Sequence, residues 1–217
     1  MATYSVSKSF SLDTAVSDKA AAVMRMFGLT LERLSEQGVS HNCTLQINPG
    51  DIVYITGPSG AGKTVLLREI ENAVPNSQKL NLNQIELPDD KMVIDCMDGD
   101  FMTGLKLLSA AGLNDAFCVL NRPRRLSEGQ QYRFRLAMAL SAGSKFVFAD
   151  EFCTNLDRLT AAVISYNIRK HAKKTQTTFV LASSHDDLLL DLSPDVLVAK
   201  ELSGHAEVIY KRAGVKS

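Results

Sequence analysis

The sequence predicts an α/β fold with a mainly parallel central sheet, because two patterns alternate along its 217 residues. Short runs of β-branched and apolar residues indicate strands, and longer segments with apolar residues three and four apart indicate helices. One such strand, residues 51–56, leads into a glycine-rich loop and then into a helix over residues 63–73. Strands that alternate with helices in this way form parallel sheets covered on both faces.

The N-terminal third adds strands and a helical insertion. Residues 3–12 alternate loosely and indicate an edge strand, and residues 39–47 indicate a second strand. Between them, apolar residues recur at helical spacing over residues 13–37, and Gly28 is expected to interrupt this helix.

The remainder of the chain continues the alternation. Strands are predicted at residues 91–97, 145–149, 177–182, 195–199 and 206–210, and helices at residues 104–111, 128–142 and 157–173. The sequence contains no internal repeat and no long linker, so we expect one domain over residues 1–217.

Composition excludes few functions but indicates the cellular environment that we expect. Lys plus Arg equals Asp plus Glu, 24 of each, so net charge gives no argument for binding to nucleic acid or to a membrane surface. No apolar run reaches the roughly 18 residues of a membrane span, and no secretion signal begins the chain. The four cysteines form no C-x-x-C pair, so we expect reduced core thiols, no zinc site and a cytoplasmic protein without direct membrane insertion.

A phosphate-binding motif follows the strand at residues 51–56. It reads Gly57-Pro58-Ser59-Gly60-Ala61-Gly62-Lys63-Thr64, in which the glycines let backbone N–H groups surround phosphates at a helix N-terminus. Lys63 is expected to reach the β- and γ-phosphates, and the Thr64 hydroxyl is expected to hold Mg²⁺. A glycine turn with an incidental Lys-Thr is the alternative, and the flanking strand and helix argue against it.

An acidic pair, Asp150 and Glu151, ends the strand at residues 145–149. Ligands of open α/β sheets bind at the carboxyl ends of the strands, where Asp150 can hold Mg²⁺ through water. Glu151 can polarise the water that attacks the phosphate. Alone, such a pair is more often a helix cap or a solvated turn, but the phosphate loop reverses those odds.

A second motif, Leu126-Ser127-Glu128-Gly129-Gln130, resembles the signature peptide of the ATP-binding cassette (ABC) ATPases, although many members carry glycine where this chain has Glu128. The resemblance covers about residues 39–200. It implies an ABC-type fold with antiparallel N-terminal strands. It also implies that Ser127 and Gly129, with Gln130 beside them, contact ATP bound by the opposite copy of a homodimer.

Two further segments agree with this family. Residues 154–157 resemble the loop that crosses the dimer interface, and Ser184-His185 resembles the segment with the switch histidine. The resemblance implies that His185 senses the γ-phosphate during hydrolysis. By itself, a histidine after a strand is usually a polar loop residue.

Two departures from the family pattern leave assignments open. The family places a metal-contacting glutamine after the strand that we expect at residues 91–97, and Asp98 is the nearest candidate here. An acidic turn in water is an equally good explanation of Asp98. The aromatic residue that stacks on adenine is also obscured, with Phe10 or Phe27 as candidates that are more often core residues.

Basic residues concentrate around the signature peptide. They suggest a contact with nucleic acid or with the partner's phosphates, but we favour a solvated helix face because the net charge is zero. The residues are Arg122, Arg124, Arg125, Arg133 and Arg135.

The sequence therefore predicts a soluble, Mg²⁺-dependent ABC-type ATPase that dimerises head to tail on ATP and works on an unknown protein or nucleic-acid partner. An ATP-binding subunit of a membrane transporter is one alternative, and an ATP-gated interaction module with little turnover is another. Only 62 positions separate Thr64 from Leu126, which predicts a reduced helical subdomain at about residues 98–143. Three observations argue against a transporter. They are that interval, the presence of Phe152, and the resemblance of residues 150–158 and 184–188 to a non-transporter group. In some members of that group, the domain is fused to an acetyltransferase-like domain.

Overall fold

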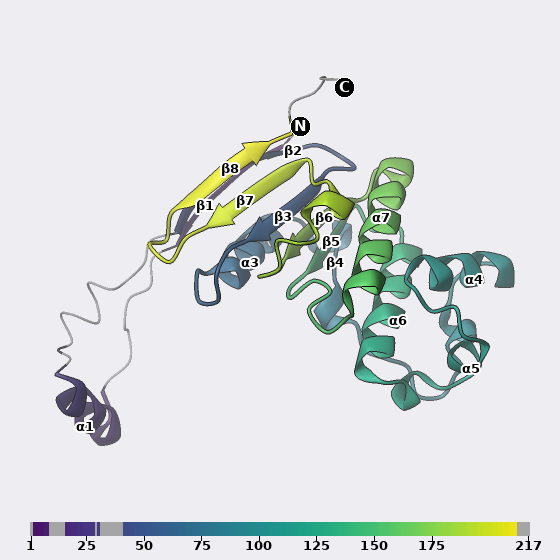
Figure 1. Ribbon diagram of the computed structural model, residues 1–217, viewed down its shortest axis with the longest axis horizontal. Helices are drawn as coiled ribbons and strands as arrows, with labels where there is room; N and C mark the ends of the chain where they lie inside the picture. Colours follow the sequence, from purple (N-terminus) through teal and green to yellow (C-terminus); the bar gives the residue numbers. More distant parts are fainter. Residues whose placement is uncertain (1, 9–15, 29, 31–40, 212–217) are drawn as a thin grey trace.

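Six strands form the main sheet of the computed structural model, which describes residues 2–8, 16–28, 30 and 41–211 (Figure 1). Their order across the sheet is β4-β5-β6-β3-β7-β8, and only the last pair is antiparallel. The mainly parallel sheet that the sequence predicts is therefore confirmed. The bounds are β3 Ile52–Thr56, β4 Lys79–Asn81, β5 Phe146–Ala149, β6 Thr178–Ala182, β7 Val196–Lys200 and β8 Ala206–Tyr210.

Helices cover both faces of this sheet, and side chains of the central strand β3 alternate between them. Ile52 and Tyr54 pack into the core shared with α6 (Glu128–Ser141) and α7 (Arg158–Thr175). Val53 and Ile55 pack on the opposite face against α3 (Lys63–Ala73). Because side chains of a strand point alternately to its two faces, a fully buried strand supports both cores.

A second, two-stranded sheet lies beside α3. Its strands are β1 (Ala2–Lys8) and β2 (His41–Ile47), which pair antiparallel as expected. The helix α1 (Asp18–Phe27) occurs between them and ends at Gly28, which adopts the left-handed conformation of a C-terminal cap. Gly28 thus interrupts the helical pattern as predicted. The candidate Phe10 and residues 13–15 and 31–37 of the expected insertion lie outside the described residues.

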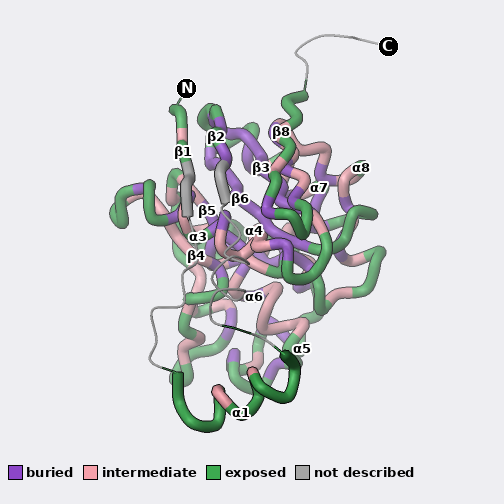
Figure 2. The backbone as a smooth tube through the Cα atoms, turned by 90° about the vertical axis from the view of Figure 1, so that its left-hand side faces the viewer, coloured by how far each residue is buried: buried purple, intermediate pink, exposed green. Residues whose placement is uncertain are grey.

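The helix α1 stands away from the rest of the molecule (Figure 1). None of the ten residues Asp18–Phe27 is buried, and the segment is exposed along nearly its whole length (Figure 2). The candidate Phe27 has 69% of its surface exposed, so it is not a core residue.

A helical lobe extends from the other end of the sheet and is formed by α4 (Phe101–Ala110), α5 (Ala116–Val119) and the N-terminal half of α6 (Figure 1). The helix α4 begins three residues before the predicted start. Asp100 explains the earlier start, because its carboxylate accepts a hydrogen bond from the Thr103 N–H at 2.8 Å and caps the helix.

The prediction of a strand at residues 91–97 is wrong. The segment contains a 3-10 turn, Ile94–Cys96, and the Val93 N–H bonds to the carbonyl oxygen of Asn121 at 2.9 Å rather than to a strand. The strand beside β5 is β4 instead, which has only three residues, two of them polar. Short apolar runs do not distinguish strands from other buried segments, and so brief a strand gives no periodic signal.

The remaining short elements connect these parts. They are the helix α8 (Leu189–Leu192) and the 3-10 turns Asn76–Gln78, Leu82–Gln84 and Pro123–Arg125. Among the described residues, no helix is both long and apolar enough to cross a bilayer.

Candidate nucleotide site

The glycine-rich loop follows β3 and is held by the end of β7. At Gly57, φ is 140°, and a Cβ atom there would lie 2.2 Å from the carbonyl oxygen of Lys200. Only glycine fits at such a distance. Gly62 then adopts a left-handed φ of 83° as the residue before α3, so the loop turns sharply into the helix. The order of strand, glycine loop and helix is as predicted.

Lys63 and Thr64 begin the first turn of α3. The Lys63 ammonium group lies over the loop and donates to the carbonyl oxygens of Gly57 at 2.8 Å and of Pro58 at 2.9 Å. The N-terminus of this 11-residue helix supplies unpaired backbone N–H groups and the positive end of its dipole. This end of the helix is therefore suited to bind phosphate.

A pocket of about 300 Å³ brings the loop together with the ends of two further strands. The strands β3, β5 and β6 are neighbours in the sheet, and their carboxyl ends meet at this edge. Gly57, Pro58 and Ala61 of the motif do not line the pocket, and the Ala61 side chain is buried. The lining residues are Ser59, Gly60, Gly62, Lys63, Thr64, Asp150, Glu151, Ser183 and Ser184.

The acidic pair directly follows β5 and lines this pocket. The Asp150 carboxylate accepts the Glu151 N–H at 3.0 Å, and Glu151 has a positive φ of 50°. Phe152 is fully buried, and its N–H bonds to the carbonyl oxygen of Ala182 on β6 at 2.8 Å. The buried neighbour fixes a backbone conformation that costs on the order of 1–3 kcal/mol for a residue other than glycine. Such strain is typical of functional sites.

The segment with His185 is joined to β3 by two hydrogen bonds. The Tyr54 hydroxyl donates to the carbonyl oxygen of His185 at 2.5 Å, and the Thr56 hydroxyl donates to the Asp186 carboxylate. Burial raises the pKa of Tyr54 to about 12, so the phenol remains a hydrogen-bond donor. His185 is exposed and is not among the lining residues, while its neighbours Ser183 and Ser184 are.

Sequence reasoning missed Asn83, which contacts Asp150 directly. Its amide oxygen accepts the Asp150 N–H at 2.9 Å, and its amide nitrogen donates to the Asp150 carbonyl at 3.3 Å. The next residue, Gln84, lines an adjoining cavity of about 400 Å³ that Asp150 also lines. The family pattern places a glutamine after a strand, but β4 has only three residues and gives no recognisable strand pattern.

The structure does not bring Asp98 to the site. It lies in an exposed turn before α4 and lines neither the phosphate-loop pocket nor the cavity beside Gln84. The sequence places Asp98 after a strand at residues 91–97, and that strand does not form. Asn83 and Gln84 occupy the position after the strand next to β5 instead.

The signature segment starts α6 with a reciprocal cap. Ser127 accepts the Gln130 N–H at 3.4 Å, and the Gln130 side-chain oxygen accepts the Ser127 N–H at 2.9 Å. The Gln130 amide nitrogen also contacts the Cys118 sulfur at 2.9 Å. Gln130 therefore has a structural role, which the pattern S-x-x-Q signals. Ser127, Gly129 and Gln130 do not line the phosphate-loop pocket of their own chain.

Three of the five clustered arginines have local partners. Arg133 donates to the carbonyl oxygens of Gly129 at 3.1 Å and Gly112 at 2.8 Å, and Arg135 donates to that of Ile85 at 3.0 Å. Arg124 forms an ion pair with Asp89. These contacts favour the local, structural explanation of the cluster over a phosphate-binding surface.

The donor atoms at the pocket suit Mg²⁺. Thr64 and Asp150 present hard oxygen atoms there, and Mg²⁺ usually combines one or two such protein ligands with water and substrate phosphate. In the described part of the chain, no group of three or more His, Cys, Asp or Glu could hold a metal alone. The free cysteines, at 43, 96, 118 and 153, are spread over the fold.

Comparison with known proteins finds relatives among ATP-binding proteins. A family model described as ABC transporter matches residues 40–95. The chain is 29% identical over 195 residues to the methionine import ATP-binding protein MetN of Streptococcus agalactiae, covering 71% of the chain and 54% of that protein. It is 30% identical over 180 residues to ABC transporter I family member 10 of Arabidopsis thaliana, covering 70% and 65%. The chain thus spans about half to two thirds of the length of these relatives.

Two more comparisons concern a lipoprotein-releasing system and the fold. The lipoprotein-releasing system ATP-binding protein LolD of Novosphingobium aromaticivorans is 29% identical over 200 residues, covering 75% of the chain and 86% of that protein. The dimeric structure of MJ0796, described as a bacterial ABC transporter cassette, superimposes with a TM-score of 0.67 at 18% identity. That match covers 98% of this chain and 99% of the other, so the two share a fold.

Proposed function

We propose that this chain, which contains an ATP-binding cassette ATPase domain, hydrolyses ATP with Mg²⁺ and associates head to tail when ATP is bound. One observation carries the proposal. The phosphate loop, the Asp150–Glu151 pair and the Ser183–Ser184 segment line one pocket at the carboxyl ends of three neighbouring strands. Phosphate transfer depends mainly on such positioning and on charge stabilisation.

Each group has a defined part in this reaction. Lys63 and the N–H groups at the start of α3 bind the phosphates of ATP. Thr64 and Asp150 would hold Mg²⁺, which when bound neutralises charge on the phosphates. Glu151 orients and polarises the attacking water, and its strained backbone keeps the carboxylate on the pocket side. His185, next to the pocket residues Ser183 and Ser184, would sense the γ-phosphate.

The second copy follows from the position of the signature segment. Ser127 and Gly129 stand at the N-terminus of the 14-residue helix α6, which is a suitable phosphate site. They do not line the pocket of their own chain, which supports a contact with ATP bound by another copy. Product release then lets the two copies separate, so hydrolysis times their association.

For the work that ATP drives, we favour a transporter partner. MetN and LolD are named as ATP-binding proteins of import and release systems, and this outweighs the short interval between Thr64 and Leu126. The non-transporter group with an acetyltransferase-like domain is not supported by these relatives. A module with little turnover is disfavoured because Glu151 lines the pocket beside the phosphate loop.

The central test is the substitution Glu151→Gln. We expect hydrolysis to fall at least about 100-fold, because the general base is lost while ATP binding remains. In ATP and Mg²⁺, light scattering should then detect a dimer. The matched control is Glu207→Gln on the exposed side of β8, which should hydrolyse ATP normally. A monomeric Glu151→Gln protein would contradict the head-to-tail proposal.

The partner can be tested with the same trapped protein. A membrane subunit that co-purifies from detergent extracts only in ATP would support the transporter role. Stimulation of the wild-type ATPase by DNA or RNA, weakening as salt rises, would instead favour a nucleic-acid partner.

A further inference from the structure

We infer that α1 of one copy docks in an apolar groove between α4 and α5 of a second copy, which strengthens the ATP-bound dimer on which this inference rests. Both surfaces are exposed in the single chain. They match in apolar character, in charge and in their position relative to the proposed dimer.

The helix α1 has the features of a binding helix without a partner. Ala20, Val23, Met24 and Phe27 are three and four residues apart, so they form one apolar stripe. Val23 is 53% exposed and Phe27 is 69% exposed. Isolated helices of about ten residues are marginal in water and gain most of their stability by packing an apolar face. The stripe therefore needs a surface to cover it.

Both ends of α1 are nevertheless specified locally. The Ser17 hydroxyl accepts the Ala20 N–H at 3.3 Å, and Gly28 closes the other end with its N–H on the Arg25 carbonyl. Caps of this kind stabilise a helix by roughly 1 kcal/mol each. The segment is thus prepared to present a helical face to a partner.

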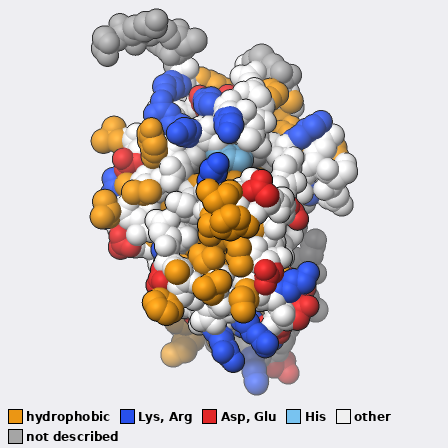
Figure 3. Space-filling view, turned by 90° about the vertical axis from the view of Figure 1, so that its right-hand side faces the viewer, with side chains coloured by type: hydrophobic (Ala, Val, Ile, Leu, Met, Phe, Trp, Pro, Cys, Tyr) orange, Lys and Arg blue, Asp and Glu red, His pale blue; other side chains and the backbone are white. Residues whose placement is uncertain are grey.

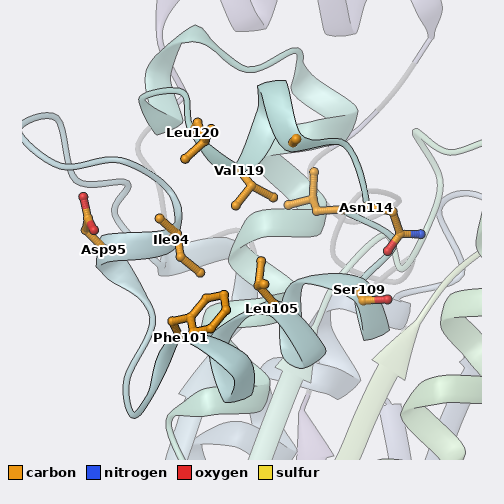
Figure 4. Close-up of a pocket in the computed structure, with 10 residues that line it drawn as sticks. Ile94, Asp95, Phe101, Leu105, Ser109, Asn114, Val119 and Leu120 are labelled. Atoms are coloured by element: carbon orange, nitrogen blue, oxygen red, sulfur yellow. The ribbon is translucent and has the colours of Figure 1, made fainter.

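The groove lies in the helical lobe and has a volume of about 670 Å³. Its walls are mostly apolar, and Ile94, Phe101, Leu105, Val119 and Leu120 face the same space (Figure 4). Phe101 is 65% exposed and Leu120 is 61% exposed. Hydrophobic side chains gather in a patch on this end of the molecule (Figure 3). Such contiguous patches mark interaction sites, and a grooved one suits a helix.

One charge of the groove is opposite to those of α1, because Asp95 lines the groove itself. Around it, residues 89–125 carry six acidic residues against five basic ones, and Arg124 forms an ion pair with Asp89. The helix α1 carries Lys19 and Arg25 against Asp18. A pairing of Lys19 or Arg25 with Asp95 would favour association and set the orientation of the helix. The six acidic residues are Asp89, Asp90, Asp95, Asp98, Asp100 and Asp115.

The arrangement of the chain favours a second copy as the source of the helix. The helix α1 and the groove lie at opposite ends of the molecule (Figure 1). The strands β1 and β3 point the same way in this view, so α1 extends from the side that carries the phosphate loop. In a head-to-tail dimer, the lobe with the partner's signature segment approaches that side. Each α1 would then meet the partner's groove rather than its own.

A membrane surface is the main competing partner for α1. Helices that bind anionic lipid carry many Lys and Arg residues on the polar face, whereas α1 has only two basic residues and one acidic residue.

The first test measures dimer dissociation constants in ATP and Mg²⁺ on the Glu151→Gln background. Val23→Ser with Phe27→Ser, or Phe101→Ser with Leu120→Ser, should each weaken the dimer about tenfold or more. Combining all four should add little, because both pairs remove the same contact. The control, Leu190→Ser with Ile209→Ser, changes exposed apolar residues elsewhere. ATP binding by monomers should be unchanged in every variant.

Unchanged dissociation constants in both pairs would overturn the docking contact and leave the ATPase proposal standing. If the Glu151→Gln protein forms no dimer at all, the head-to-tail proposal fails and this inference fails with it.

The second test identifies which copy supplies α1. A Met26→Cys chain is mixed with a Leu120→Cys chain in ATP, and a bismaleimide reagent should cross-link the two. As a control, either chain is mixed with a Leu190→Cys chain, which should be cross-linked less. The wild-type chain sets the background of its own cysteines. Two outcomes would overturn the inference. One is efficient cross-linking inside a single chain that carries both cysteines. The other is binding of α1 to anionic vesicles with no cross-link between copies.

Discussion

The main sheet buries most of its apolar residues, whereas the helical lobe and α1 expose many of theirs. The strands β3 and β6 are buried along their whole length, and the pocket residues extend from these rigid strands (Figure 2). In the lobe, Phe117 is 87% exposed, and in α1, Met26 is 83% exposed. Catalytic groups need positions fixed to a fraction of an ångström, whereas an association surface needs apolar area that remains accessible. The fold separates these two requirements in space.

The largest expected effect comes from truncating one phenylalanine in each region. Phe179→Ala in β6 should lower the free energy of unfolding by about 3–5 kcal/mol, because a fully buried ring leaves a cavity. Phe117→Ala in α5 should change it by no more than about 0.5 kcal/mol. Urea unfolding of the monomer without ATP measures both. Similar losses for the two variants would show that the lobe has a tightly packed core at this position.

A smaller effect is expected from Asn83, which acts within the sheet edge. Asn83→Ala removes both hydrogen bonds to the Asp150 backbone, so the acidic pair should be less well positioned. We expect kcat to fall about tenfold, equivalent to about 1.4 kcal/mol, with little change in KM for ATP. Asn76→Ala, in the exposed turn Asn76–Gln78, is the matched control.

A parallel rise in KM, or an equal loss in the control, would argue that Asn83 does not position Asp150. Partial recovery of kcat in Asn83→Asp, which keeps the acceptor for the Asp150 N–H, would support the assigned contact.

The smallest effect concerns pH and the sheet-facing side of α7. Burial, followed by the nearby charge of Lys174, lowers the pKa of His171, whose ring makes a T-shaped contact with that of Phe179. The unfolded state therefore binds a proton more readily than the folded state as pH falls. This contribution is complete above pH about 6.5 and is lost at lower pH.

Thermal unfolding at pH 7.5 and 5.5 measures this contribution. His171→Gln should reduce the loss of stability between the two pH values, and His205→Gln, at an exposed position, should not. An identical pH dependence in both variants would contradict the assignment to His171.

Local patterns were sufficient wherever the structure is specified within a few residues. The phosphate loop, the strand before Asp150 and the helices α6 and α7 were all predicted close to their observed positions. Their signals are hydrophobic periodicity, glycines and cap residues, which act over one or two turns of chain. The Ser127–Gln130 cap has such a signal too, in the pattern S-x-x-Q.

The sequence by itself determined the ligand chemistry, because a phosphate loop followed by an acidic pair after a strand allows few other uses. It also determined the class of fold, because its periodicities require a covered parallel sheet. The tertiary structure decided that Asn83 rather than Asp98 lies at Asp150, since 67 residues separate the two partners and only strand pairing joins them. It likewise decided that α1 stays exposed while an apolar groove opens in the lobe, because exposure depends on contacts between distant segments and not on local pattern.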